Sequence, residues 1–198
     1  MVDKTETINL EELLNSLDSD QGRVTAIGNL LHINAIDIPL KFVDFAIHYY
    51  EKAGLFKDAA KVANEAKIAE KAKELYAMAI EQRKKKDDFF GAGHIAEEAG
   101  NLFFFHADKL ADKSRMDKPA KSAYKSDLNE IAKQFYLVAI ENYKKEGVTC
   151  SNSAAELAKR IGGATKKIEV YEDMHQYEDA IRAAEEANMN YKAIEISL

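Results

Sequence analysis

The chain contains the stretch Tyr50-Glu51-Lys52-Ala53-Gly54-Leu55-Phe56-Lys57-Asp58-Ala59-Ala60, and a second copy follows 121 positions later (171 − 50). The copy reads Tyr171-Glu172-Asp173-Met174-His175-Gln176-Tyr177-Glu178-Asp179-Ala180-Ile181, without a gap. In both copies an aromatic residue ends an apolar helical pattern, a short turn follows, and small residues return at helical spacing. A repeat of this kind indicates an array of helix pairs, because one pair cannot bury its apolar face alone.

Two weaker copies lie between these. A helix predicted from about Ala69 to Lys85 and another from Leu128 to Lys145 match at an offset of 60, with Tyr76 opposite Tyr136. The sequence therefore predicts four helix pairs over 37–189, with a degenerate unit at 101–126, an N-terminal helical cap at 1–36 and a terminal helix at 190–198. The predicted fold is all-α, a single domain over 1–198, in which about 11–12 helices stack as an α-solenoid of antiparallel pairs.

These residues resemble the tetratricopeptide-repeat superfamily over about residues 38–198. The aromatic and small positions of that repeat are filled in the first unit by Tyr50, Phe56, Ala59, Ala63 and Ala66, and in the fourth by Tyr171, Tyr177, Ala180, Ala184 and Ala187. The chain departs from the repeat in having no tryptophan, and in carrying Ile47 or Ile168 where the first helix has a small residue. The resemblance implies a concave face lined by the first helix of each pair, and a role in binding proteins.

Composition narrows the class of protein. With 46% hydrophobic and 31% charged residues, the chain has the composition of an ordinary folded protein. Its net charge of −6 argues against the basic footprint that nucleic-acid binding requires. Cys150 is the only cysteine, no stretch approaches the ~20 apolar residues of a membrane span, and the N-terminus lacks a signal pattern. We expect a cytoplasmic protein without a transmembrane segment.

Residues opposite the apolar stripe of each first helix are candidates for partner binding. They are Asp44, His48, Glu51, Glu70, Glu74, Asp127, Glu130, Gln134, Glu169 and Glu172. Most are acidic, so the leading hypothesis is a non-catalytic interaction scaffold or adaptor that binds a basic, lysine-containing peptide or protein on its concave face. A merely solvated face explains the same pattern equally well, since single exposed charges contribute little binding energy.

A second hypothesis is self-association. The terminal helix carries Tyr191, Ile194 and Leu198 on one stripe, and uncovered ends of repeat arrays are sticky. Phe103-Phe104-Phe105 adds a further apolar feature. Three consecutive side chains point to different sides of a helix, so they cannot all face one core, and one of them is a candidate for contact with a partner.

A third hypothesis, a cofactor- or metal-binding helical enzyme, has less support. Gly91-Ala92-Gly93-His94-Ile95-Ala96 fits the letter of a dinucleotide fingerprint, but no strand is predicted before it. Glu172-x-x-His175 has the spacing of one di-iron ligand pair, and a second pair is missing. We therefore predict no catalytic, cofactor-binding or metal-binding residues.

Overall fold

The computed structural model describes residues 19, 22–23, 25–26, 40–113 and 118–198 of the chain. This part is helical almost throughout, and it contains eight α-helices, one 3-10 turn and no β-strand. The helices are α3 (Leu40–Lys52), α4 (Phe56–Glu65), α5 (Ala69–Lys84), α6 (Phe89–Lys113), α7 (Lys118–Glu146), α8 (Ser151–Asp173), α9 (Tyr177–Glu186) and α10 (Asn190–Ser197), and the 3-10 turn is η1 (Val148–Cys150). The all-α class is confirmed. The N-terminal cap predicted for 1–36 lies outside the described residues, apart from the few positions given above.

The chain forms two compact units. Unit 1 runs from Met1 to Leu75, and unit 2 from Tyr76 to Leu198, so α5 spans the division. The prediction treated 1–198 as one domain. No described helix combines the length and the apolar character needed to cross a membrane.

The first copy of the repeated stretch forms a three-residue connection between α3 and α4. The Gly54 N–H donates to the Glu51 carbonyl at 2.9 Å, and the Leu55 N–H donates to the Tyr50 carbonyl at 2.8 Å. Gly54 has φ of 71°, the left-handed conformation that ends many helices. These paired bonds define a Schellman motif, which satisfies the last carbonyls of α3.

The second copy makes the same connection between α8 and α9. The His175 N–H donates to the Glu172 carbonyl at 2.9 Å, and the Gln176 N–H donates to the Tyr171 carbonyl at 2.8 Å. His175 adopts φ of 58° where the first copy has Gly54. The sequence repeat is therefore also a repeat of backbone geometry.

The next turn also matches. Lys67 and Asn188, again 121 positions apart (188 − 67), have φ of 65° and 58°. As a result α4 and α9 have the same length of 10 residues. The helices that follow, α5 and α10, begin at Ala69 and Asn190, at the same offset (190 − 69).

Small side chains allow the helices of each copy to pack closely. In α4 the side chains of Ala59, Ala60 and Ala63 have no exposed surface, and in α9 the same holds for Ala180 and Ala184. A methyl group at these positions lets two helix backbones approach closely, which agrees with the buried alanine pattern predicted from the sequence.

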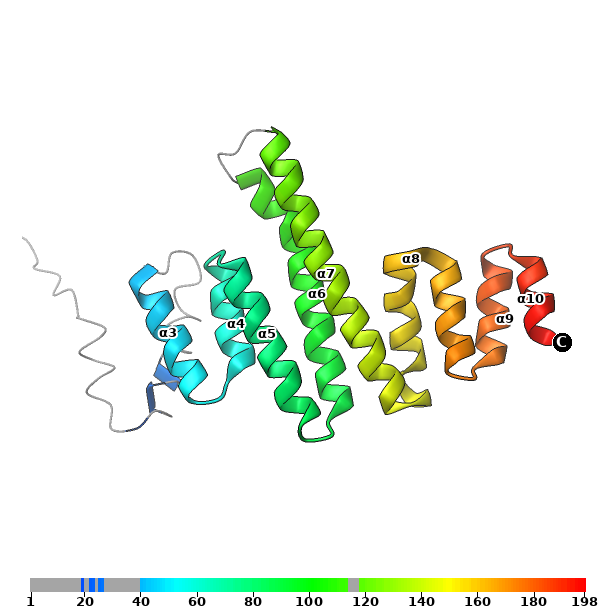
Figure 1. Ribbon diagram of the computed structural model, residues 1–198, viewed down its shortest axis with the longest axis horizontal. Coiled ribbons are helices and arrows are strands. Elements are labelled where there is room, and N and C mark those ends of the chain that lie inside the picture. Colours follow the sequence, from blue (N-terminus) through cyan, green and yellow to red (C-terminus); the bar gives the residue numbers. More distant parts are fainter. Residues whose placement is uncertain (1–18, 20–21, 24, 27–39, 114–117) are drawn as a thin grey trace, which may run out of the picture. The chain divides into compact units, whose positions relative to one another are not determined.

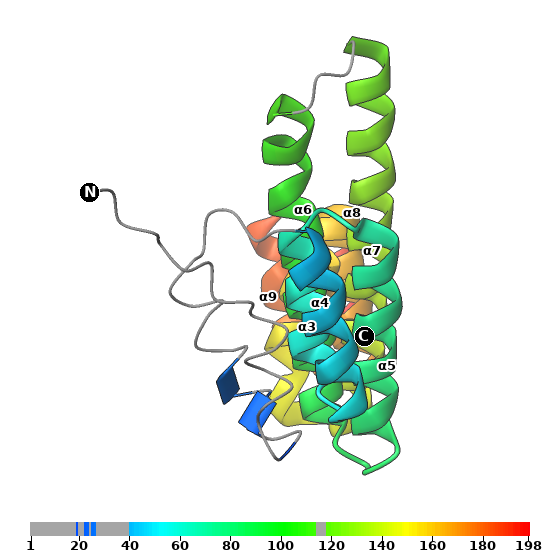
Figure 2. The same cartoon turned by 90° about the vertical axis from the view of Figure 1, so that its left-hand side faces the viewer.

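In unit 2, α6 and α7 are long helices that lie side by side (Figures 1 and 2). Residues 101–113 continue α6, and residues 118–126 begin α7, so the described part of the segment predicted as a degenerate unit at 101–126 belongs to these two long helices. Nothing between 101 and 113 interrupts a helix, and Pro119 falls in the first turn of α7, where its missing N–H is not needed.

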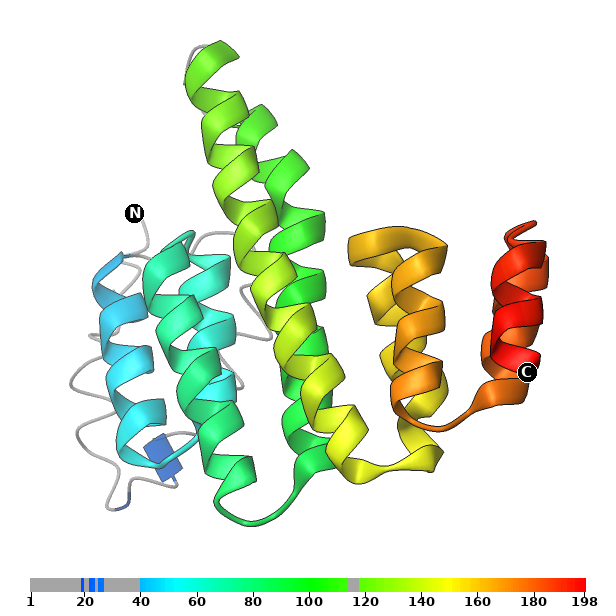
Figure 3. The same cartoon turned by 45° about the vertical axis from the view of Figure 1, so that its right-hand side comes forward.

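Helix α8 consists of two helical segments. Gly163 has φ of 71° and ψ of −160°, which interrupts the helical backbone between the two segments. Figure 3 shows the two segments as two helical stretches joined by a bend. Helix α9 contacts the α8 helix on one side and α10 on the other.

Candidate functional site

Five of the predicted site residues lie in unit 1. Asp44 and His48 are exposed on α3, Glu70 and Glu74 are exposed on α5, and Glu51 is half-buried at the end of α3. The helical period thus identified side chains that reach solvent.

The other five lie in unit 2. Asp127, Glu130 and Gln134 are exposed on α7, whereas Glu169 and Glu172 are half-buried on the second segment of α8. Whether the residues of the two units act on one ligand stays a prediction.

A lysine in the first copy of the repeat pairs with two of the predicted acids. Lys71 Nζ lies 2.8 Å from Glu51 Oε1 and 3.5 Å from Glu74 Oε2. The hydrogen bond that Lys71 donates to Glu51 is the main cause that raises the pKa of Lys71 above its ordinary value, against the desolvation that lowers it. The charges of Glu51 and Glu74 are therefore partly balanced by Lys71.

The second copy contains the same arrangement. Lys192 Nζ lies 3.1 Å from Glu172 Oε1 and 3.5 Å from Glu195 Oε1, and the hydrogen bond with Glu172 raises the pKa of Lys192. We call each set a lysine triad. The three residues of one triad correspond to those of the other at the offset of 121, as 192 − 71 shows for the lysines.

The lysine triads are a feature that the sequence interpretation missed. The two partners are 20 residues apart in the chain, as for Lys71 and Glu51, so helical spacing does not reveal them. The available signal was the repeat itself, since a lysine and two glutamates recur together at one offset.

Two more predicted acids have lysine neighbours on their own helix. Glu169 lies 2.6 Å from Lys166, and Glu130 lies 4.0 Å from Lys133. Three predicted acids make no ion pair within the described part of the chain: Asp44, Glu70 and Asp127. Among the predicted acids, these three therefore keep an unpaired negative charge.

The glycine motif lies inside α6, which begins at Phe89, and not in a loop between a strand and a helix. A Cβ atom built on Gly93 would lie 2.7 Å from the ring of Tyr143, and one built on Gly100 would lie 2.7 Å from the ring of Tyr136. Each glycine therefore accommodates a tyrosine of α7. This helix-packing role accounts for Gly93 without a nucleotide.

Both tyrosines also bond to polar groups of α6. The Tyr143 hydroxyl donates to Glu97 Oε2 at 2.8 Å, and the Tyr136 hydroxyl donates to Asn101 Oδ1 at 2.9 Å. Burial raises the pKa of Tyr143 far above its ordinary value, and the hydrogen bond to Glu97 adds to the effect. Both hydroxyls thus serve as hydrogen-bond donors that fix the pairing of α6 and α7.

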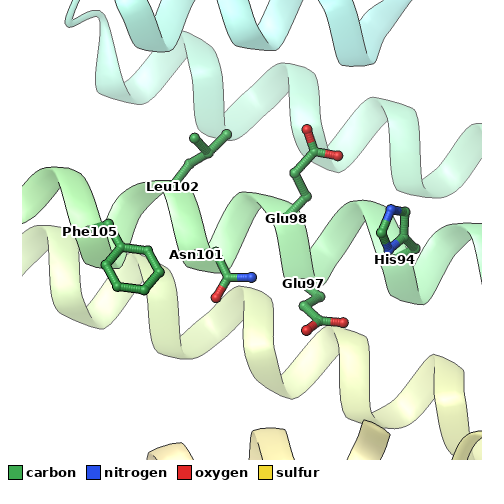
Figure 4. A pocket seen from close by; sticks show the side chains of 6 residues that line it. All are labelled: His94, Glu97, Glu98, Asn101, Leu102 and Phe105. Carbon is green, nitrogen blue, oxygen red and sulfur yellow. The ribbon is translucent and has the colours of Figure 1, made fainter.

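A hollow of about 470 Å³ lies along one face of α6 (Figure 4). Its lining side chains are His94, Glu97, Glu98, Asn101, Leu102 and Phe105. In Figure 4, His94 lies near one end of the row and Phe105 near the other. The described residues contain no group of three or more His, Cys, Asp or Glu side chains placed to hold a metal ion.

The spacing Glu172-x-x-His175 does not bring two metal ligands together. Glu172 is taken up by its lysine triad, and His175 Nδ1 lies 3.0 Å from the Tyr177 hydroxyl. The left-handed backbone of His175 places it in the turn after α8 and not on a buried helix face.

The three consecutive phenylalanines have different environments. Phe103 is buried and stacks on Phe135, with ring centroids 5.7 Å apart, while Phe104 and Phe105 remain 50% and 62% exposed. One ring therefore belongs to the core and two face outward, as expected for neighbours on one helix.

A second hollow, of about 520 Å³, lies between α6, α7 and the first segment of α8. Of the residues that line it, the sequence analysis gave only Phe104 and Phe105 as candidates for contact with a partner. In comparisons with protein-family models, curated proteins and solved structures, no match to this chain was found.

Proposed function

We propose that the chain is a tetratricopeptide-repeat-like α-solenoid that acts as a non-catalytic scaffold or adaptor for a peptide or protein partner. The observation that carries this proposal is the recurrence of one unit, with the same two turns and the same lysine triad at a single offset of 121 (175 − 54). Repeats that keep their helix connections and vary their outward residues are typical of extended binding surfaces.

The partner chemistry in this proposal follows from the uncompensated carboxylates. Asp44 and Glu70 in unit 1 and Asp127 in unit 2 are exposed acids without an ion pair among the described residues. Exposed charges of one sign accelerate association with a ligand of the opposite sign, and added salt weakens the effect. A basic, lysine-containing peptide is the ligand that fits them.

A cytoplasmic location and the absence of nucleic-acid binding are parts of the same proposal. A net charge of −6 opposes a polyanion. The single cysteine, Cys150, is a buried free thiol, in keeping with a reducing compartment.

Titration with peptides of opposite charge tests the proposal. Fluorescent peptides rich in lysine, and matched peptides rich in glutamate, are titrated into the full chain at low and high salt. We expect the basic peptides to bind more tightly, and the double variant Asp44→Lys/Glu70→Lys to weaken that binding about tenfold or more, because two attractive charges become repulsive.

Glu65→Lys/Glu146→Lys is the control with the same change of net charge, since Glu65 and Glu146 are exposed acids outside the predicted set. If the double variant and the control weaken binding equally, net charge alone explains the binding. If no basic peptide binds, the proposal of a basic ligand fails.

Self-association is a second candidate, favoured by a comparison of α10 with α5. The positions of Tyr191, Ile194 and Leu198 correspond to Glu70, Lys73 and Ala77 in the first copy. In α10 these side chains are 92%, 57% and 103% exposed. The α10 face is thus apolar where the equivalent face of α5 is mostly polar.

Transplanting the α5 residues onto α10 tests this second candidate. The variant Tyr191→Glu/Ile194→Lys should be monomeric at concentrations at which the parent chain forms dimers in analytical ultracentrifugation. A parent chain that is monomeric throughout the accessible concentration range would exclude self-association through this face.

A further inference from the structure

The hollow between α6, α7 and α8 combines apolar and cationic groups on one surface of unit 2. It has a volume of about 520 Å³. The lining residues that matter here are Phe104, Phe105, Lys133, Tyr136, Arg160 and Ile161. We call it the aromatic–arginine pocket.

The apolar part consists of two phenylalanine rings that lie outside the core. Phe104 and Phe105 are 50% and 62% exposed, and their rings meet edge to face with centroids 5.6 Å apart. Ile161 on α8 is half-buried beside them. Covering such rings with an apolar side chain removes apolar surface from water, which is favourable.

The cationic part is a guanidinium held in place. Arg160 Nη1 donates to Asn101 Oδ1 at 2.7 Å, and its Cζ lies 6.0 Å from the centroid of the Tyr136 ring. The Tyr136 hydroxyl donates to the same Asn101 oxygen at 2.9 Å. Asn101 and Tyr136 therefore orient Arg160 before any ligand arrives.

This guanidinium has no carboxylate partner within the described part of the chain. A planar guanidinium with several N–H groups left over matches the two oxygens of a carboxylate. Lys133 adds a second positive charge to the pocket, and its nearest ion-pair partner, Glu130, lies at 4.0 Å. The charge of this pocket is opposite to that of Asp44, Glu70 and Asp127.

We propose that the aromatic–arginine pocket binds an acidic-apolar peptide segment, one in which a bulky apolar side chain stands next to a carboxylate. The apolar side chain packs on Phe104 and Phe105, and the carboxylate pairs with Arg160. Charge complementarity selects this occupant, because a basic peptide would meet Arg160 and Lys133 with charge of the same sign. The inference goes beyond the proposed function, whose ligand is basic.

Peptide display on the full chain is the first step of the test. Random peptides on phage are selected on immobilised protein, and we expect enrichment of sequences with an aromatic or large aliphatic residue beside aspartate or glutamate. One enriched peptide is then synthesised with a fluorescent label, together with a version in which the acid is replaced by its amide, and both are titrated by fluorescence anisotropy.

Variants of the pocket locate the binding. Arg160→Gln should raise the Kd of the labelled peptide about tenfold or more, because it removes a charge-assisted bidentate pair. Phe105→Ser should raise it about tenfold through lost apolar contact. Arg160→Lys should restore part of the affinity, since it keeps the charge and loses the planar geometry.

Two matched variants serve as controls. Arg182→Gln removes an exposed arginine of α9, and Phe90→Ser removes a 55% exposed phenylalanine of α6; neither residue lines the pocket. Both should leave the Kd unchanged. Far-UV circular dichroism of every variant checks that the helices are intact.

Several outcomes would overturn the inference. It fails if the enriched peptides lack the acidic-apolar pair, or if Arg160→Gln and Phe105→Ser bind as tightly as the parent. Equal binding of free phenylpropionate would show a site for a small carboxylate rather than for a peptide. Enrichment of basic peptides alone would overturn this inference and leave the proposed function standing. Enrichment of acidic-apolar peptides alone would support this inference and contradict the basic ligand of the proposed function.

Discussion

The two copies of the repeat have the same connections between their helices but different side chains on their solvent-facing surfaces. Both use the same three-residue connections and the same lysine triad. Yet the outward positions of α5 hold Glu70 and Lys73, where α10 holds Tyr191 and Ile194. A small set of residues thus fixes the packing of the unit, while the outward positions differ between the copies.

The largest expected effect comes from the buried alanines that both copies share. Ala63→Leu in α4 and Ala184→Leu in α9 should each destabilise the protein by about 1–3 kcal/mol, because both side chains are fully buried and the added atoms have no room. Urea unfolding followed by circular dichroism measures this loss. Ala77→Leu, at an exposed position of α5, is the control and should change stability little.

If only one of the two buried variants lowers the unfolding midpoint, the copies are packed differently despite their common backbone. If neither differs from the control, the alanines do not limit the approach of the helices.

The turn residue is the next point of comparison. Gly54→Ala should destabilise by about 1 kcal/mol, because φ of 71° is unfavourable for a residue with a Cβ atom. His175→Gly should stabilise by a similar amount, less whatever the 3.0 Å contact between His175 and Tyr177 contributes. Thermal unfolding of both variants gives the answer. A destabilised His175→Gly protein would mean that the contact with Tyr177 outweighs the backbone strain.

A third prediction concerns the connection between α5 and α6, which has the same left-handed turn as the repeat but adds a side-chain cap. Asp88 caps α6, with its Oδ1 accepting from the Gly91 N–H at 2.7 Å, whereas the corresponding residue Gln176 makes no such bond. The bond from Gly91, followed by the contact with Arg83, holds the pKa of Asp88 below its usual range. Asp88→Ala should therefore lower the free energy of unfolding by about 1 kcal/mol at neutral pH, and Gln176→Ala should lower it less.

The pH dependence of this effect has a definite sign. Because the folded-state pKa of Asp88 is lowered, its contribution is present above the unfolded pKa of about 4 and is lost as the pH falls through the folded value. The difference between the parent and Asp88→Ala in urea unfolding should thus shrink in strong acid. A difference that persists there would assign the effect to packing and not to the charged cap.

The smallest effect is expected from the lysine triads. In a double-mutant cycle of Lys71→Met and Glu51→Gln, the coupling energy should lie below about 1 kcal/mol, since both side chains are about one-third exposed. High salt should reduce it. The cycle of Lys192→Met and Glu172→Gln should show a coupling no larger than this. A coupling of several times that size would make the triads a main source of stability.

The sequence alone predicted the helices of the repeated stretch well because their signals are local. A left-handed turn at Gly54, alanines at helical spacing in α4 and the start of α5 at Ala69 all follow from neighbouring residues. The lengths of α6 and α7 did not follow. The polar composition of 118–127 carries little apolar periodicity, so α7 was predicted to begin at Leu128 and not at Lys118.

The candidate sites show the same division. Outward positions such as Asp44 follow from the helical period, and the structure leaves Asp44 exposed. The pairing of Glu51 with Lys71 and the placement of Arg160 beside Phe105 depend on contacts between helices that sequence spacing does not encode.

The break at Gly163 has a consequence for how the second copy opens. A helix cannot carry its hydrogen-bond ladder through a residue at φ 71° and ψ −160°, so the first amides after it lack partners four residues back. In native-state hydrogen exchange, the segment ending at Gly162 and the segment beginning at Ala164 should open as separate cooperative units. The exchange rates of the backbone amides should then change abruptly between Gly162 and Ala164, and this change would mark the boundary of the fourth predicted helix pair.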